Sequence, residues 1–174
     1  MATRPVFVFD ASPLIALATS GLLDRLKDLG VDAVVPVEVR DEVVGEGGAR
    51  DHPERLVLEQ MLLTRAISVD RVRDRAALRR VSGNARLSRA DAAALCLARE
   101  RRARLIADDR DLRGAARALG VAVGGSLYVL AMAVGKDVIT TREAAAAAER
   151  MIAHGWYCPP RLLKSFTDLM IGGG

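Results

Sequence analysis

Cysteine, lysine and aromatic residues are scarce in this chain of 174 residues. Its two cysteines, Cys96 and Cys158, provide neither a disulfide framework nor the spacing of a cysteine metal site. Aromatic residues make up 3% of the chain and hydrophobic residues 51%, so we expect an aliphatic core built largely from alanine and leucine. Lysine occurs only at Lys27, Lys136 and Lys164, and arginine therefore carries almost all of the positive charge.

Long hydrophobic runs are missing as well. The apolar run at 6–9 is broken by Asp10 before it reaches the length of the hydrophobic region of a secretory signal. The weakly polar run at 121–134 is shorter than the ~20 residues that span a bilayer. We therefore expect a cytoplasmic protein that does not bind membranes, and the length suits a single domain over residues 1–174.

Short β-branched runs alternate with longer segments of helical periodicity. The runs are VFVF (6–9), AVVP (33–36), AISV (66–69), RLIA (104–107) and VAV (121–123). This alternation is typical of βαβ units and predicts an α/β fold with a parallel sheet of about five strands. We expect the core of the domain over residues 5–135 and C-terminal helices over residues 140–171.

Helix starts are marked at two places, and one segment is marked as a loop. Ser12 before Pro13 predicts an N-cap followed by proline at the first helical position, and Thr140 with Glu143 predicts a capping box. The glycine-rich stretch at 45–53 is expected to be a loop.

The net charge of +4 and the pI of about 9.6 suit a protein that binds nucleic acid, although a mildly basic surface is also common in proteins that do not. Seven arginines lie between Arg71 and Arg89, where we expect a helix followed by a turn. This segment is either an ordinary solvated face or a strip that contacts phosphates, and the sequence leaves both interpretations open.

Acidic residues follow two of the expected strands directly. Asp10 comes after VFVF, and Asp108, Asp109 and Asp111 come after RLIA. Because ligands of open parallel sheets bind outside the carboxyl ends of the strands, we expect these carboxylates at one edge. Carboxylate oxygens are the ligands that Mg²⁺ and Mn²⁺ prefer, so the pattern indicates a metal site.

Local structure offers another interpretation for some of these acids. Asp91 lies three residues after Ser88 and fits the second half of a capping box. Asp109 and Asp111 fit a helix start, where the macrodipole favours negative charge. Asp10 has the strongest functional case, because a carboxylate at the end of a buried strand loses hydration unless a partner or a metal compensates for it.

Four segments together resemble the acidic motifs of the PIN domain family, in order along the chain. They are VFDASPLIAL (8–17), VPVEVRDEVV (35–44), LSRADAAALCLA (87–98) and LIADDRDLRGAARALGVAVGGSLYVL (105–130). Within that family the sequence is most similar to short prokaryotic proteins related to the VapC toxins. The resemblance implies a three-layer sandwich in which helices flank a central parallel sheet.

The resemblance also implies roles for individual residues. The catalytic residues and ligands of Mg²⁺ or Mn²⁺ would be Asp10, Glu42, Asp91 and Asp109. Auxiliary positions would be Ser12, Asp108, Asp111 and Glu38, the last being the alternative to Glu42 one helical turn earlier. Contacts with nucleic acid would come from Arg86, Arg89 and Arg110. Two positions depart from the family pattern, because Ala107 stands where Thr or Ser is common and Asp91 stands where the closest group usually has Glu.

The function implied is metal-dependent hydrolysis of single-stranded RNA by an endoribonuclease, the toxin of a toxin–antitoxin pair. Its partners would be RNA, a small antitoxin protein and a second copy of the chain in a homodimer. One alternative is a non-catalytic PIN-fold module that binds nucleic acid or protein. Another is a haloacid dehalogenase-type phosphatase, although Ser12 stands where that family has an aspartate.

Overall fold

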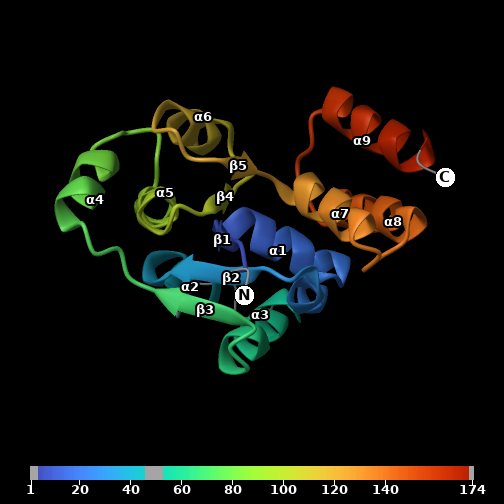
Figure 1. Cartoon of the computed structure of the whole chain (residues 1–174), viewed down its shortest axis with the longest axis horizontal. Coiled ribbons are helices and arrows are strands. Elements are labelled where there is room, and N and C mark those ends of the chain that lie inside the picture. Colours follow the sequence, from blue (N-terminus) through green and yellow to red (C-terminus); the bar gives the residue numbers. More distant parts are fainter. Residues whose placement is uncertain (1–3, 46–52, 173–174) are drawn as a thin grey trace.

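Five parallel strands form the centre of the fold (Figure 1). The computed structural model describes residues 4–45 and 53–172. The strands are β1 (Val6–Phe9), β2 (Asp32–Pro36), β3 (Ile67–Asp70), β4 (Arg104–Ile106) and β5 (Val123–Gly124). They pair in the order β3-β2-β1-β4-β5, and every pair is parallel. The expected α/β class with about five strands is confirmed.

The last strand differs from the expected one. It was predicted at 121–123 and is found at Val123–Gly124. The backbone N–H of Val121 donates to the carbonyl of Ala116, 2.9 Å away, so Val121 closes the preceding helix and does not pair in the sheet. The loop expected at 45–53 falls mostly on residues 46–52, which lie outside the described part of the chain.

Helices cover both faces of the sheet. The connections from β1 to β3 contain α1 (Ala11–Ser20), η1 (Leu23–Leu29), α2 (Val37–Val44) and α3 (Pro53–Leu63). The connections from β3 to β5 contain α4 (Arg75–Ser82), α5 (Arg89–Arg101) and α6 (Arg110–Ala118). Because the strand order reverses direction at β1 and crossovers are right-handed, α1 and α3 lie on one face and α5 and α6 on the other, while α2 contacts helices of both groups. This is the expected three-layer arrangement.

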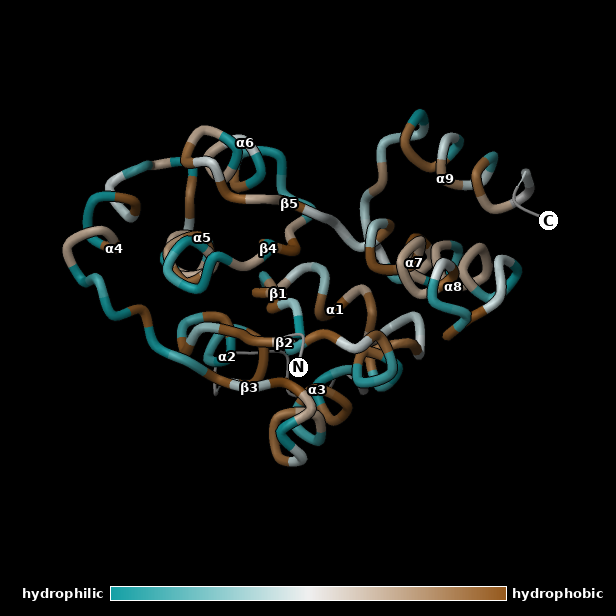
Figure 2. The backbone as a smooth tube through the Cα atoms, viewed as in Figure 1, coloured by the Kyte–Doolittle hydropathy of each residue, from teal (hydrophilic) through white to brown (hydrophobic). Residues whose placement is uncertain are grey.

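Helix α5 is the most deeply buried helix next to the sheet. It packs on β1, β2 and β4, and all residues from Ala92 to Ala98 are buried. Its alanines allow the helix backbone to lie close to the strands, where Phe9 and Ile106 are fully buried. Figure 2 shows the same distribution, since β2 is hydrophobic along most of its length and the chain around α4 is mostly hydrophilic. The N-terminus of α5, which carries Asp91, is therefore held firmly against the sheet.

Three helices follow the last strand: α7 (Ser126–Gly135), α8 (Thr141–Ala153) and α9 (Pro160–Gly172). Helix α8 packs on α1 and α7, and α9 packs on α8 and α7, so these helices lie at one end of the molecule in Figure 1. The predicted capping box of Thr140 and Glu143 is confirmed. No helix in the described residues is long and apolar enough to cross a membrane.

The predicted cap at Ser12 is wrong. Helix α1 begins at Ala11, so Asp10 occupies the N-cap position and Ser12 lies inside the first turn. The N–H of Asp10 donates to the carbonyl of Ile106 across the sheet at 3.0 Å. Strand pairing thus continues to Asp10, and the helix starts immediately after it.

Candidate functional site

Asp10 and Asp108 lie at the carboxyl ends of two neighbouring strands. Asp10 follows β1, and Asp108 is the second residue after β4, which is paired with β1 through Phe9 and Ile106. The order of the strands reverses at this point of the sheet, because β2 lies on one side of β1 and β4 on the other. Such reversals leave a crevice outside the strand ends, which is the usual binding place in open α/β sheets.

The carboxylate of Asp10 is buried and difficult to ionise. Its side chain is only 5% exposed, and burial raises its pKa from 3.8 to about 7. A hydrogen bond from the backbone of Ala11 acts in the opposite direction, while the negative charges of Asp91, Glu42 and Asp108 raise the pKa further. Among the described residues, no lysine or arginine forms an ion pair with Asp10. The oxygens of such a buried carboxylate are the hard donors that divalent cations such as Mg²⁺ prefer, and a bound cation would compensate for its lost hydration.

Asp91 and Glu42 bring two further carboxylates toward Asp10. Asp91 is half-buried in the first turn of α5, and its Oδ2 accepts a hydrogen bond from the N–H of Ser88 at 2.6 Å. The N–H of Asp91 in turn donates to Ser88 Oγ at 3.0 Å, so the predicted capping box is present. Glu42 lies on α2, and burial followed by the charge of Asp91 raises its pKa. Asp91 therefore caps its helix and contributes to the acidic site at the same time.

Asp108 is held by a network that reaches the C-terminal helices. Its Oδ1 accepts from the N–H of Ser126 at 2.8 Å, and its Oδ2 accepts from Ser126 Oγ at 2.5 Å and from Trp156 Nε1 at 2.8 Å. Gly125 completes this arrangement, because a Cβ there would lie 2.7 Å from Asp108 Oδ1 and 2.9 Å from an Arg113 nitrogen. The Asp108 carboxylate is thus fixed in direction, and only glycine leaves room for it.

The other predicted acids and Ser12 lie at the starts of α1, α2 and α6. Asp109 is exposed at the N-cap of α6, where its Oδ1 accepts from the N–H of Leu112 at 2.8 Å. Asp111 is exposed and lies 3.7 Å from an Arg86 nitrogen in an ion pair. Ser12 is exposed and Glu38 is half-buried in the first turn of α2. Of the acids that follow β4, it is Asp108 whose charge acts on Asp10.

The acids suit a hard divalent cation by chemistry, but they are not gathered into a finished coordination shell. In residues 4–45 and 53–172, no three His, Cys, Asp or Glu side chains lie close enough together to hold a metal ion. The donors that share an electrostatic environment are Asp10, Glu42 and Asp91, with Asp108 at the neighbouring strand end. All of them offer oxygen, which Mg²⁺ and Mn²⁺ prefer over zinc-type ligands.

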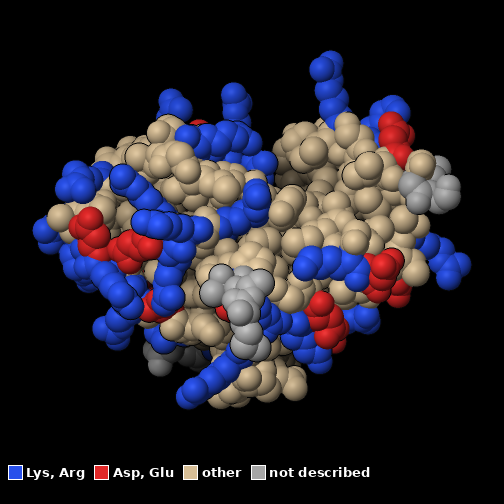
Figure 3. All heavy atoms as spheres, in the orientation of Figure 1, with Lys and Arg blue, Asp and Glu red and all other residues tan. Residues whose placement is uncertain are grey.

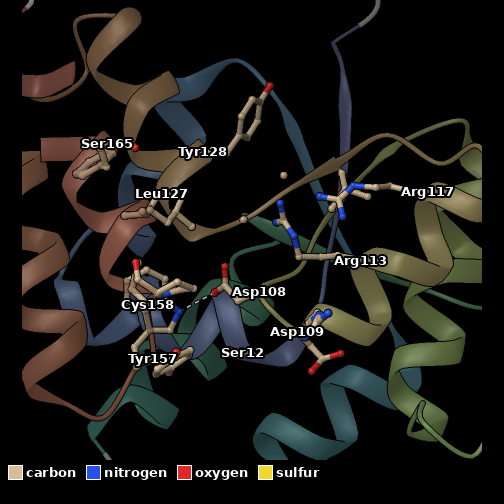
Figure 4. Close-up of a pocket in the computed structure, with 18 of the residues that line it drawn as sticks. Ser12, Asp108, Asp109, Arg113, Arg117, Leu127, Tyr128, Tyr157, Cys158 and Ser165 are labelled. Atoms are coloured by element: carbon tan, nitrogen blue, oxygen red, sulfur yellow. Dashed lines mark hydrogen bonds between the residues drawn. The ribbon is translucent and has the colours of Figure 1, made fainter. Parts of the chain in front are cut away.

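A groove of about 1220 Å³ opens beside the acidic site (Figure 4). Ser12, Asp108 and Asp109 are among the residues that line it. Arg110, Arg113 and Arg117 of α6 line one wall, and the opposite wall comes from the C-terminal helices and the segment that joins them, which includes Trp156 and Tyr157. In Figure 4 the labelled Asp108 lies between Arg113 on one side and Cys158 on the other.

Sequence reasoning missed the residues that complete this site. Ser126 and Trp156 hold Asp108, and Arg113 and Arg117 line the groove, yet none of them was predicted to belong to a site. One signal was present, because Trp156 is the only tryptophan of a chain with few aromatic residues. An isolated tryptophan does not say which distant residue it contacts.

Comparison with known proteins gives one match. A family model described as a PIN domain matches residues 6–171, which includes all of the acids above and the C-terminal helices. Neither the search of curated proteins nor the search of solved structures gives a match.

Proposed function

Since the chain belongs to the PIN domain family, whose members are generally nucleases, we propose that it is a metal-dependent endoribonuclease that hydrolyses single-stranded RNA. The observation that carries the proposal is Asp10. A carboxylate that is 5% exposed, has a pKa of about 7 and has no cationic partner among the described residues is costly for the fold, and binding a divalent cation would compensate for that cost.

Each acid has a defined part in this proposal. Asp10, Glu42 and Asp91 would hold Mg²⁺ or Mn²⁺, with Asp109 at the mouth of the site offering the oxygen that its cap does not use. The ion, when bound, supplies Lewis acidity toward a phosphate oxygen and lowers the pKa of a water molecule. Asp108 is a positioning residue, because Ser126 and Trp156 occupy both of its oxygens.

Arginines at the helix starts would bind the RNA backbone. Arg89 and Arg110 are the first residues of α5 and α6, and both are exposed. Arg86 is exposed as well and pairs with Asp111 only at 3.7 Å, so a phosphate can replace that partner. Figure 3 shows lysine and arginine gathered over the side of the molecule that carries α4, α5 and α6. Bidentate contacts of arginine with phosphate suit this arrangement.

The toxin assignment, the antitoxin and the homodimer belong to the same proposal. Leu56 and Leu63 on α3 are 68% and 84% exposed, and Val69 on the edge strand β3 is 38% exposed. Exposed apolar side chains on neighbouring elements suit a protein partner. The antitoxin is tested by asking whether a short reading frame next to this gene encodes a protein that co-purifies with the chain. The homodimer is tested by measuring the mass of the isolated protein in solution.

RNA cleavage with and without metal tests the proposal. Labelled single-stranded RNA is incubated with the wild type in chelator and then with restored Mn²⁺, alongside Asp10→Asn and the matched control Asp24→Asn, which changes an exposed acid on η1. We expect cleavage only with metal, its loss in Asp10→Asn, and wild-type rates in Asp24→Asn. Cleavage that continues in chelator contradicts the metal mechanism. RNA binding without any cleavage in metal favours the non-catalytic module.

A further inference from the structure

The groove beside the acids is large and reaches the carboxyl ends of the strands. It measures about 1220 Å³, which is larger than the roughly 300–1,000 Å³ typical of small-molecule pockets. Asp108, Asp109 and Ser12 line it, so it reaches the carboxyl end of β4 next to Asp10. Figure 3 shows a recess between α6 and the C-terminal helices. Whatever fills this groove therefore reaches the strand ends.

We propose that the groove binds the single-stranded segment of RNA next to the cleaved phosphate, with α6 arginines on its phosphates and Tyr157 stacked on a base. This inference rests on the function proposed above and adds residues to it. Its support comes from the charge of one wall and the aromatic residues of the other.

One wall of the groove carries three arginines of α6. Arg110, Arg113 and Arg117 are spaced three and four residues apart and thus share one face of α6. None of them forms an ion pair within the described residues. Arg113 donates to the carbonyl of Ala107 at 2.9 Å, and burial together with the charge of Arg117 lowers its pKa, while the charge of Asp108 acts in the opposite direction. An anion placed between these guanidinium groups would relieve their repulsion, and phosphate fits them bidentately.

The opposite wall gathers the polar aromatic residues of the chain. The sequence has one tryptophan and two tyrosines, and all three line this groove. Tyr157 is 78% exposed, which leaves its ring free for stacking. Trp156 is held at Asp108 through its Nε1, and Tyr128 already stacks against Arg104, whose guanidinium carbon lies 4.7 Å from the ring centre. Aromatic rings facing a cationic strip are the usual elements of a groove for single strands.

An acidic amphipathic peptide is the competing occupant. Leu162 and Leu169 on α9 line the groove and are 51% and 62% exposed, so they offer apolar contacts. A peptide would make hydrophobic contact with any apolar side chain at position 157, so it does not require an aromatic ring there. A base stacks only on the flat face of an aromatic side chain. The two occupants therefore respond differently to Tyr157→Leu, which keeps the surface apolar, and to Tyr157→Phe, which keeps the ring.

The fluorescence of Trp156 reports on this groove alone, because the chain has no second tryptophan. The experiment titrates full-length Asp10→Asn protein, in which we expect no cleavage, with a short uridine oligonucleotide and with an abasic oligonucleotide of the same length. The variants Tyr157→Phe, Tyr157→Leu and Arg117→Gln are made in this background. Arg142→Gln is the matched control, since it removes the same charge from an exposed position on α8 that does not line the groove.

We expect the uridine oligonucleotide to change Trp156 emission and to bind about tenfold more weakly to Tyr157→Leu, with Tyr157→Phe close to the parent. The abasic oligonucleotide should bind all proteins weakly. Arg117→Gln should reduce the slope of log K against log salt by about 0.7 for a single-stranded phosphate contact, and Arg142→Gln should leave it unchanged. Equal thermal melts of the Tyr157 variants show that they are folded.

Three results overturn the inference: unchanged binding in Tyr157→Leu, equal binding of the abasic oligonucleotide, or emission that responds to an acidic amphipathic peptide and not to RNA. Cleavage assays separate this failure from that of the proposed function. If cleavage depends on metal and has the same KM in wild type and in Tyr157→Leu, the proposed nuclease function stands and the proposed RNA-binding role of the groove is wrong. If the binding results are as expected but the wild type does not cleave RNA with metal present, the RNA-binding role of the groove stands and the proposed nuclease function is wrong.

Discussion

Replacing Asp10 by asparagine is expected to stabilise the metal-free protein, and increasingly so as the pH rises from about 5 to about 7. The carboxylate has a pKa of about 7 in the folded protein, raised from 3.8 mainly by burial. Below both values the carboxyl group is protonated in the folded and unfolded states, so its ionisation does not change the free energy of unfolding. Between them the unfolded chain has released the proton and the folded chain has kept it, so stability falls as the pH rises. Above the folded pKa the cost is constant.

The size of the effect follows from the shift. The difference between 3.8 and about 7 corresponds to roughly 4 kcal/mol at about 1.36 kcal/mol per pKa unit, fully present above pH 7. At about pH 5 the same linkage gives only about 2 kcal/mol. Because 1 kcal/mol changes the melting temperature of a domain of this size by about 2–4 °C, Asp10→Asn should melt roughly 10 °C above the wild type near neutral pH. Near pH 5 the gain should be roughly half as large.

Thermal melts in chelator at several pH values measure this difference, with Asp24→Asn as the control for loss of an exposed carboxylate. Added Mn²⁺ should raise the melting temperature of the wild type and change that of Asp10→Asn much less, because a ligand that binds only the native state stabilises according to its occupancy. A variant that melts below the wild type, or by the same margin at every pH, refutes the reasoning. Asp10 would then be a hydrogen-bonded structural residue.

Three further outcomes test neighbouring parts of the site. Gly125→Ala should cost about 1–3 kcal/mol in denaturant unfolding and shift Trp156 emission, because its Cβ would press on the Asp108 carboxylate, whereas Gly114→Ala in open space on α6 should gain up to about 1 kcal/mol. If both substitutions change the free energy of unfolding in the same direction, the close contact between position 125 and Asp108 is contradicted. Ser88→Ala should lower stability by about 1 kcal/mol through loss of the α5 cap, and an unchanged melting temperature argues against the capping box. Replacing Arg79 and Arg80 by glutamine should flatten the salt dependence of RNA binding by about 0.7 per lost contact, and an unchanged slope makes the segment an ordinary solvated surface.

Local patterns in the sequence determined the strands, the capping boxes and the position of Asp10. Four of the five strands lie within one residue of their predicted ends, because β-branched runs bounded by helical segments have few alternatives. The capping boxes at Ser88 and Thr140 need only residues three positions apart, so they are readable without any tertiary contact. Asp10 at the end of the first strand follows from the same local logic.

Tertiary contacts decided where helix α1 begins. They also decided which of the acids after β4 acts on the charge of Asp10. Pairing of the Asp10 N–H with Ile106 extends the sheet contact by one residue, and this moves the start of α1 away from the predicted cap at Ser12. Asp108 and Asp109 are adjacent in the sequence and point to different surroundings, because Asp109 caps α6 while Asp108 is held by Ser126. No local rule distinguishes them, since both follow the same strand.

The groove is the part that only the folded chain produced. Trp156 reaches Asp108 across 48 positions of sequence, and the wall that it forms faces α6 because α8 and α9 pack against α1 and α7. Spacing along a chain determines which side chains share a strand end or a helix face, because those distances are set by the backbone within one element. Which faces meet across the sheet depends on packing of the whole core. For that reason the sequence predicted which acids follow the strands, and it did not predict the residues that hold and surround Asp108.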